Sequence, residues 1–514
     1  MTYFARPTSS RRNFSAMSYF KAAIIGFLLV QSLTAAEIPT YIPSSQNLFA
    51  VARELYGRKL IDHLEYADPS RKPGAARNDF ERKLIANYLY LIRDYSNRRN
   101  EPTISYGLEL VLANRQKKAN SSYPKIFPKV RIDPCKNLSA TIIYRIDNEL
   151  TDDARYDGKS WNGWAGFAEN ATVDFSYDKM KFGFGFERVS WGLGKYGNLL
   201  FSRQALPMVV IRFAYISGKL DFESLSGFLS PLGEELVGPI DDPGYFTDQQ
   251  RYIAAHSLSF KAGGGLSLSV RETVVYGGPG RRFEPAYAFP LIWYHGYQLN
   301  SGMDDNTLAA AGFDYRRNGK IWLYGEILVD DFQIEKKTNS DNEPDQLAFL
   351  LGGEAYDLGK NGTGIRVEYA RINNWVYNQP RSHNRLINRN FPIGFPDGPD
   401  NDIVNWECSW WPIGSVRLVY FGAYQRVGEG RIDSPWTAPW LDTDEYSEPF
   451  PTGTVQRKVT NGLSVLVMDK KAFWGKMELQ LADIRNAGNI PAIKTEWEFS
   501  VEIGCNLPPF SREL

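Results

Sequence analysis

Polar and apolar residues alternate with a period of two over most of the chain from about residue 139 to the C-terminus. In the segment 495–503, threonine or large apolar residues occupy the odd positions, and three glutamates and a serine occupy the even ones. Because successive side chains of a β-strand point to opposite faces, such a strand separates an apolar environment from a polar one. We therefore predict a series of strands, each with one face against a protein core or against lipid.

The connections between these predicted strands are of two kinds. Short turns rich in Gly, Asn and Lys close hairpins at 178–179, 217–219, 263–265, 318–319, 360–362 and 469–471. Long polar connections join the other strand ends at 148–171, 188–207, 229–256, 277–306, 331–346, 372–414 and 438–454. Connections that are short at one end and long at the other favour an outer-membrane barrel over a soluble sandwich.

The number of strands depends on three weaker segments. Strands at 104–113, 123–133 and 430–437 bring the total to 18, whereas omitting the first two gives 16. An even number keeps both chain termini on the periplasmic side of the membrane. We predict an all-β transmembrane fold in which residues 101–514 form an antiparallel outer-membrane β-barrel, and we favour 18 strands.

The N-terminus carries an export signal. Lys21 precedes the apolar run 22–30, and small residues before Glu37 form a cleavage region. Because this run is too short to span a bilayer, residues 1–36 are predicted to be a secretory signal peptide. Met17 is an alternative start, and Arg11-Arg12 also resembles a twin-arginine signal. The twin-arginine route exports folded cargo, which a lipid-facing barrel is not, so we favour general secretion.

Residues 37–100 show a helical pattern instead of the strand pattern. Ser44 or Ser45 is placed to cap a first helix, and Asn78 with Glu81 resembles a capping box at the start of a second. We interpret this region as a small periplasmic helical segment that precedes the barrel. The same pattern also fits a dimerisation element or a plug.

Composition limits the classes of function. Aromatic residues make up 14% of the chain, which suits the interfacial girdles of a barrel. The 59 basic and 59 acidic residues leave no basic excess, so no nucleic-acid partner is expected. Cys135, Cys408 and Cys505 are too few and too scattered for a zinc site, although one disulfide remains open. The four histidines have no nucleophile nearby, and we expect no catalytic residue, metal or cofactor.

Tryptophans in the predicted long connections are candidates for binding sugar. An indole ring covers the C–H face of a sugar while neighbouring polar groups bind its hydroxyls. The alternative is that these rings belong to the membrane-interface girdle. We predict that six residues contact polysaccharide: Trp161, Trp375, Trp410, Trp411, Asp400 and Asp402.

Three segments resemble the capsule assembly Wzi family of outer-membrane barrel proteins. The clearest is 188–207, in which Trp-Gly-Leu-Gly is followed by Leu-Phe-Ser-Arg-Gln-Ala-Leu-Pro. The others lie at 256–290 and 306–332. The motif residues for which the resemblance implies structural roles are Trp191, Gly192, Gly194, Ser202, Ala205, Pro207, His256, Tyr276, Asn306, Asp330 and Asp331.

The resemblance implies a lectin-like, non-enzymatic protein of the bacterial outer membrane that holds capsular or other surface polysaccharide on the cell. It also implies periplasmic termini, contact with outer-membrane lipid, and recognition by the barrel assembly machinery during biogenesis. The alternative is a porin-like channel for small solutes or oligosaccharides, which requires an open lumen. A salt-bridged plug would instead use the charged residues predicted to face inward, namely Arg271, Arg366, Glu368, Arg417 and Lys476.

Overall fold

The structure is a computed structural model. It describes residues 40–41, 46–59, 66–67, 103–116, 120–232, 250–331, 343–441, 446–468 and 473–513. The predicted signal peptide at 1–36 and the predicted second N-terminal helix lie outside these residues, and so does the predicted turn at 469–471.

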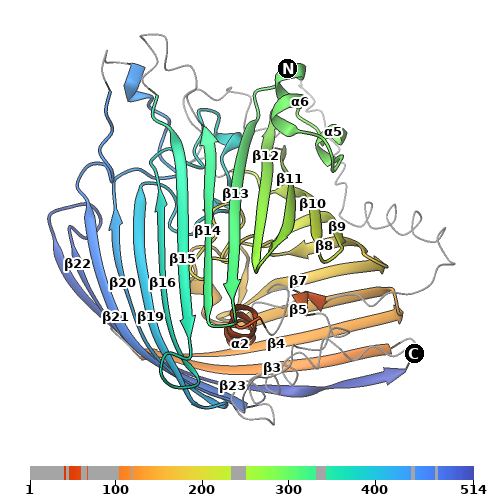
Figure 1. Ribbon diagram of the computed structural model, residues 1–514, viewed down its shortest axis with the longest axis vertical. Helices are drawn as coiled ribbons and strands as arrows, with labels where there is room; N and C mark the ends of the chain where they lie inside the picture. Colours follow the sequence, from red (N-terminus) through yellow and green to blue (C-terminus); the bar gives the residue numbers. More distant parts are fainter. Residues whose placement is uncertain are drawn as a thin grey trace, which may run out of the picture.

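Eighteen long antiparallel strands in the described chain form one closed barrel, which confirms the predicted fold and strand number (Figure 1). Each strand pairs with its neighbours in the sequence, and the last strand pairs with the first, from Thr103↔Glu513 to Gln116↔Phe499. The strands are β3 (Thr103–Gln116), β4 (Asn120–Cys135), β5 (Leu138–Asp147), β7 (Trp164–Tyr177), β8 (Met180–Glu187), β9 (Met208–Ile216), β10 (Leu220–Leu229), β11 (Gln250–Gly263), β12 (Leu266–Gly278), β13 (Asn306–Arg317), β14 (Ile321–Asp331), β15 (Gln346–Tyr356), β16 (Thr363–Ile372), β19 (Asn401–Ile413), β20 (Val416–Val427), β21 (Gln456–Met468), β22 (Phe473–Arg485) and β23 (Ile493–Glu513).

The remaining elements are short. The helices are α2 (Gln46–Gly57), α5 (Pro285–Ala288) and α6 (Tyr294–Ser301), with single 3-10 turns η1 (Leu150–Asp152), η4 (Ser382–Asn384) and η5 (Pro439–Leu441). The two-residue strands are β1 (Thr40–Tyr41), β2 (Tyr66–Ala67), β6 (Ser160–Trp161), β17 (Ile387–Asn388) and β18 (Phe391–Pro392). No helix among the described residues is long and apolar enough to cross a bilayer.

Four of the predicted boundaries are wrong. The connections predicted at 148–171 and 229–256 end earlier, because β7 begins at Trp164 and β11 begins at Gln250. The segment 430–437 is not a strand but part of the connection 428–455. Pro435 lies in this segment, and its missing N–H would interrupt a ladder of hydrogen bonds. The long connection predicted at 372–414 ends at residue 400, because β19 begins at Asn401 and continues to Ile413.

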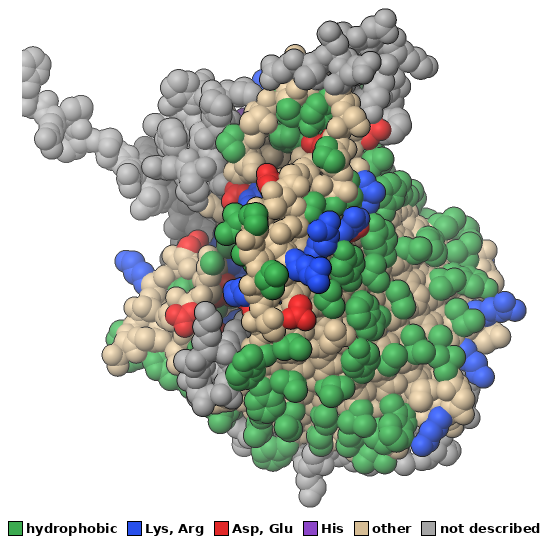
Figure 2. Space-filling view, turned by 90° about the vertical axis from the view of Figure 1, so that its left-hand side faces the viewer, with side chains coloured by type: hydrophobic (Ala, Val, Ile, Leu, Met, Phe, Trp, Pro, Cys, Tyr) green, Lys and Arg blue, Asp and Glu red, His purple; other side chains and the backbone are tan. Residues whose placement is uncertain are grey.

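The outer face of the barrel is apolar around its circumference. Figure 2 shows a broad band of hydrophobic side chains on the side that carries β20–β22. Phe184 shares the outer face of β8 with the exposed Phe182, whereas Gly183 is buried on the inner face. Other exposed residues of the band are Ile142, Ile211, Phe260, Val270, Leu351, Val367, Leu463, Leu479 and Ile503.

A test of this orientation is the substitution Phe184→Arg. Phe184 lies about halfway along the ~25 Å apolar band, five residues beyond the turn that ends at Lys179. We expect F184R to lower the free energy of unfolding in lipid vesicles by about 2–4 kcal/mol, because lipid does not hydrate a guanidinium. Urea unfolding followed by tryptophan fluorescence measures this difference.

Glu496→Arg is the matched control, since Glu496 is exposed on the lumen face of β23. We expect E496R to change the same free energy by less than about 1 kcal/mol, the usual range for an exposed ion pair. Equal losses in both variants would contradict the assignment of the two faces.

Candidate functional site

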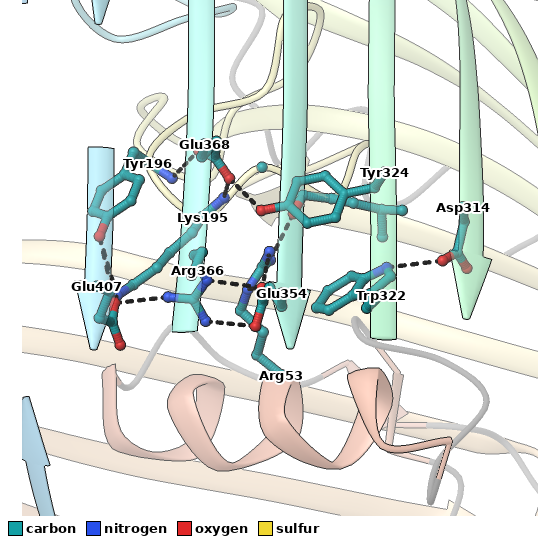
Figure 3. Close-up of polar contacts among 12 residues, drawn as sticks. Arg53, Lys195, Tyr196, Asp314, Trp322, Tyr324, Glu354, Arg366, Glu368 and Glu407 are labelled. Carbon is teal, nitrogen blue, oxygen red and sulfur yellow. Dashed lines mark hydrogen bonds and ion pairs between the residues drawn. The ribbon is translucent and has the colours of Figure 1, made fainter. Parts of the chain in front are cut away.

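Helix α2 lies inside the barrel and is tied to its wall (Figure 3). Arg53 forms an ion pair with Glu354 of β15 at 2.8 Å and donates a hydrogen bond to the carbonyl of Leu193 at 2.6 Å. Arg58 pairs with Asp357 at 2.7 Å, beyond the end of β15. A plug was one of the alternatives that the sequence left open for this segment. The position of α2 inside the barrel fits that alternative.

Inward-facing charges around α2 form one connected cluster. Arg366 of β16 pairs with Glu354 at 2.8 Å and with Glu407 of β19 at 2.7 Å. Glu407 also accepts from Arg417 of β20 at 2.6 Å and from the ammonium of Lys195. The side chains of Glu354 and Glu407 are each only 2% exposed, and each of these buried carboxylates is paired with at least two cations.

The connection 188–207 folds into the lumen against this cluster. Glu368 of β16 accepts hydrogen bonds from the backbone N–H groups of Lys195 at 2.9 Å and Tyr196 at 3.2 Å. The same carboxylate accepts from the hydroxyl of Tyr324 at 2.6 Å. Figure 3 shows these groups converging from β14, β16 and the connection. The barrel wall thus holds the backbone of the connection directly.

The glycines of the family motif allow this connection to fold tightly. Gly192 has a φ of +138°, and a Cβ at this position would lie 2.6 Å from Glu326 Oε1. A Cβ on Gly194 would lie 1.9 Å from the carbonyl oxygen of Gly197. Beside them the buried Trp191 packs edge-to-face on Phe201, with ring centroids 5.0 Å apart. These residues shape the connection.

A second connection, 373–400, folds onto the first. The N–H of Ser202 donates to the carbonyl of Ile393 at 2.8 Å, and Asn388 donates to the carbonyl of Pro207 at 3.3 Å. Asp330, at the end of β14, accepts from the N–H of Tyr377 in this connection. Asn306 and Ala205 also lie in buried positions, where the amide of Asn306 donates to the carbonyl of Asn384 at 3.1 Å.

Two further motif residues lie on the outer wall. His256 Nε2 lies 3.1 Å from Glu272, whose carboxylate also accepts from the first N–H groups of α6. Tyr276 accepts from the N–H of Glu284 at 3.3 Å and packs under α5 and α6. Both residues therefore fix the connection 279–305 against β11 and β12. Asp331 lies opposite Gln346, at an irregularity in the pairing of β14 with β15.

Little empty space remains beside α2. A polar cavity of about 160 Å³ separates it from β10–β14, with Tyr56, Glu223 and Arg271 in its lining. This volume is below the roughly 300–1,000 Å³ of typical small-molecule sites. Arg271 pairs with Glu326 at 2.6 Å. The inner face of β22 is more open, and there Lys476 pairs with Glu478 at 2.8 Å.

Three tryptophans meet above the barrel wall at its long-connection end. The ring centroid of Trp375 lies 4.9 Å from that of Trp436 and 5.3 Å from that of Trp440, and all contacts are edge-to-face. Tyr446 packs on Trp440 at 6.2 Å. We call Trp375, Trp436, Trp440, Tyr446 and Glu448 the rim cluster. Trp375 and Trp440 are buried, whereas Trp436 remains half-exposed.

Glu448 supplies the polar centre of the rim cluster. Its Oε1 accepts from the indole N–H of Trp375 at 2.9 Å, from Asn374 at 2.9 Å and from the hydroxyl of Tyr446 at 3.0 Å. Its Oε2 forms no hydrogen bond with any described residue, and neither does the indole N–H of Trp436. Burial raises the pKa of the Glu448 carboxyl above its usual range. The cluster thus offers one acceptor and one donor beside a half-exposed ring.

The sequence identified only part of this arrangement. Trp375 was predicted as a site residue, but Trp436 was hidden because it fell in the supposed strand 430–437. Glu448 comes from a different connection, and no spacing in the sequence relates it to Trp375. Trp161, another predicted residue, lies on β6 with 80% of its side chain exposed.

The predicted aspartates have internal partners in the structure. Asp400 is fully buried and accepts from the N–H of Gly430 at 2.8 Å and from the N–H and hydroxyl of Thr452. It thereby joins two long connections, and burial raises the pKa of its carboxyl. Asp402 pairs with Arg426 at 2.6 Å. Asp400 therefore faces no open surface, and Asp402, on the outer face of β19, is buried against Arg426.

The predicted location of Trp410 and Trp411 in a long connection is wrong. Both lie near the end of β19, beside the short turn at 414–415 and opposite the long connections. Trp410 faces outward, with the ammonium of Lys360 4.5 Å from its ring centroid, as in an interfacial girdle. Trp411 is buried on the inner face. Their position removes the reason for predicting that they contact an external glycan.

No group of three or more His, Cys, Asp or Glu residues in the described part of the chain is arranged to hold a metal ion. Cys135, Cys408 and Cys505 are free.

Comparison with solved structures supports the fold. This chain is similar to Wzi from Escherichia coli, with 12% identity and a TM-score of 0.61. That protein is described as an outer-membrane protein involved in group 1 capsule assembly and as a carbohydrate-binding β-barrel. The match covers 91% of this chain and 99% of that one. OccD3 from Pseudomonas aeruginosa is 10% identical with a TM-score of 0.46 over 79% of this chain and 92% of its own. The comparison with curated proteins gave no match.

The family model for capsule assembly protein Wzi matches residues 143–481, which is more than half of the 514 residues. The matched region runs from β5 to β22 and includes all the motif residues described above. This chain therefore belongs to the Wzi family of capsule assembly proteins.

Proposed function

We propose that this outer-membrane protein binds capsular or other surface polysaccharide through its long connections, in a lectin-like and non-enzymatic way. The observation that carries the proposal is the rim cluster. There the partly exposed indole of Trp436 packs on Trp375, whose N–H donates to a carboxylate with one oxygen not hydrogen-bonded to any described residue. An aromatic face with adjacent donors and acceptors suits a sugar ring. The carbohydrate binding described for Wzi from Escherichia coli is consistent with this role.

The partly filled lumen is consistent with binding and argues against a porin-like channel. Helix α2 and the connections 188–207 and 373–400 occupy the interior beside β13–β19, and buried ion pairs hold α2 there. A polymer bound on the outer surface does not need to pass through the barrel. Trp161, exposed on another long connection, is proposed as an additional contact.

The two ends of the barrel differ in the length of their connections, and this difference suggests how the barrel is oriented in the membrane. We propose that the end with short turns and both barrel termini faces the periplasm, which places the rim cluster outside the cell. Each stacking contact contributes modestly, but a repeating polymer engages several copies of the protein at once. Retention of a capsule therefore does not require a tight single site.

Trp436→Ala is the direct test of the rim cluster. Loss of one stacking contact of about 0.5–1.5 kcal/mol should weaken binding of a purified surface oligosaccharide by about 2- to 10-fold. Titration calorimetry with the detergent-solubilised barrel measures this change, and the polysaccharide retained on cells should fall with it.

Trp410→Ala is the matched control, because it removes a partly exposed outward indole from the opposite end of the barrel. Binding and retention should stay at the wild-type level, with both variants present in the membrane in equal amounts. Equal weakening by W436A and W410A, or unchanged binding by W436A, would contradict the proposed site.

Planar-bilayer conductance separates binding from transport. The wild-type barrel should conduct ions much less than an open porin of similar size, because α2 and two connections fill much of its lumen. The double substitution Arg53→Ala with Arg58→Ala should raise the conductance, since it removes the ion pairs of α2 with Glu354 and Asp357. Stable porin-like conductance of the wild type would favour the channel instead.

A further inference from the structure

Five neighbouring strands carry a charged residue on the outer face, in one line of register pairs that runs obliquely to the membrane because the strands are tilted. In register order, Arg371 of β16 lies opposite Asp402 of β19, which lies opposite Arg426 of β20. Arg426 lies opposite Arg457 of β21, which lies opposite Arg485 of β22. We call Arg371, Arg426, Arg457 and Arg485 the arginine row. It forms a continuous line across the barrel wall.

The row faces outward and marks the upper limit of the apolar band. Arg426 shares its face of β20 with the exposed Tyr420 and Tyr424, and Arg457 shares its face of β21 with the exposed Leu463. Arg485 shares its face of β22 with the exposed Leu479. In Figure 2, Lys and Arg side chains gather above the hydrophobic band on this side of the barrel.

The height of the row matches the edge of a bilayer. Arg426 lies ten residues beyond Val416, the first residue of β20 after the short turn. At about 3.3 Å per residue and a tilt of about 35–45°, this distance corresponds to about 25 Å along the membrane normal. The apolar band of a typical outer-membrane barrel has the same height. Arg426 therefore lies where the headgroups of the outer leaflet begin, and the strand tilt places the other arginines of the row within about 6 Å of that height.

Internal partners account for only two of the four arginines. Arg426 pairs with Asp402, at 2.9 and 2.6 Å, and Arg371 donates to Asn373 Oδ1 at 2.9 Å and lies 3.8 Å from the ring centroid of Phe450. Arg457 and Arg485 form no hydrogen bond or ion pair with any described residue. Like charges directly opposite one another on adjacent strands repel, so this arrangement calls for an external anion.

One nearby carboxylate reduces the charge but does not cancel it. Asp483 lies two residues before Arg485 on the same face of β22, and its carboxylate accepts from the hydroxyl of Thr495 at 2.8 Å. Four arginines thus face two aspartates along this edge, Asp402 and Asp483. The excess positive charge is concentrated at Arg457 and Arg485.

We propose that the arginine row binds the phosphate groups of a phosphorylated lipid in the outer leaflet. The planar guanidinium forms paired hydrogen bonds with phosphate oxygens, and adjacent arginines can share one group or hold two. The row points sideways into the leaflet and not into the lumen or up toward the rim cluster. Its ligand is therefore a membrane lipid, and the contact fixes the depth of the barrel in the bilayer.

The test is binding of bisphosphorylated lipid A to the detergent-solubilised full-length barrel, measured by native mass spectrometry. The double substitution Arg457→Gln with Arg485→Gln should weaken binding by about tenfold or more, because it removes two charge-assisted contacts. Each single substitution should give an intermediate loss, which keeps the test available if the double variant does not fold. Heat-modifiable migration on a semi-native gel reports folding of each variant.

Arg317→Gln is the matched control, since Arg317 is exposed on the outer face of β13 at the short-turn end. It should bind lipid A as the wild type does. Lipid A that lacks both phosphates should bind the wild type weakly, with the affinity that the double variant has for intact lipid A. Inorganic phosphate at the same concentration should not displace lipid A from the wild type. Equal binding by the wild type and the double variant, or by both forms of lipid A, would overturn the proposal.

Discussion

Everything in this molecule depends on the pairing of β23 with β3, which closes the sheet. Lipid offers no hydrogen bonds, so any strand edge left open within the membrane would expose a row of unpaired N–H and C=O groups. The closing pair runs over 13 register positions from Phe499↔Gln116 to Glu513↔Thr103, with one irregularity between Leu507 and Phe510. Once the sheet is closed, its outer face must be apolar and its inner face encloses a lumen.

A closed lumen creates a second requirement, which is that the charged side chains inside it must have partners of opposite charge. Arg366, Glu354 and Glu407 lie far from bulk water, and a buried ion without a partner is very costly. The protein meets this requirement by bringing in Arg53 from α2 and Lys195 from the connection 188–207. The plug and the charges of the wall therefore depend on each other, and neither would be stable in this form alone.

The two ends and two faces of the barrel serve different surroundings. The long connections are fixed by the inner wall and by one another, through contacts such as those of Asp400 and Asp330. This anchoring holds the rim cluster in a defined geometry, which matters for a surface that recognises a rigid sugar ring. Just below, on the outer face, the arginine row meets the headgroup region.

The sequence by itself determined the barrel, the number of its strands and the family, because lipid on one side and water on the other impose a period of two that is readable locally. It nevertheless predicted a strand at 430–437 and missed the one at Asn401–Ile413. Its motif also marked the connection 188–207. Only the tertiary structure placed Trp410 and Trp411 at the short-turn end, brought Trp436 and Glu448 to Trp375, and aligned Arg426, Arg457 and Arg485. Connections have no periodic pattern, so local residue patterns do not reveal how they fold. The pairing register depends on interactions between strands far apart in the sequence, so local patterns do not reveal it either.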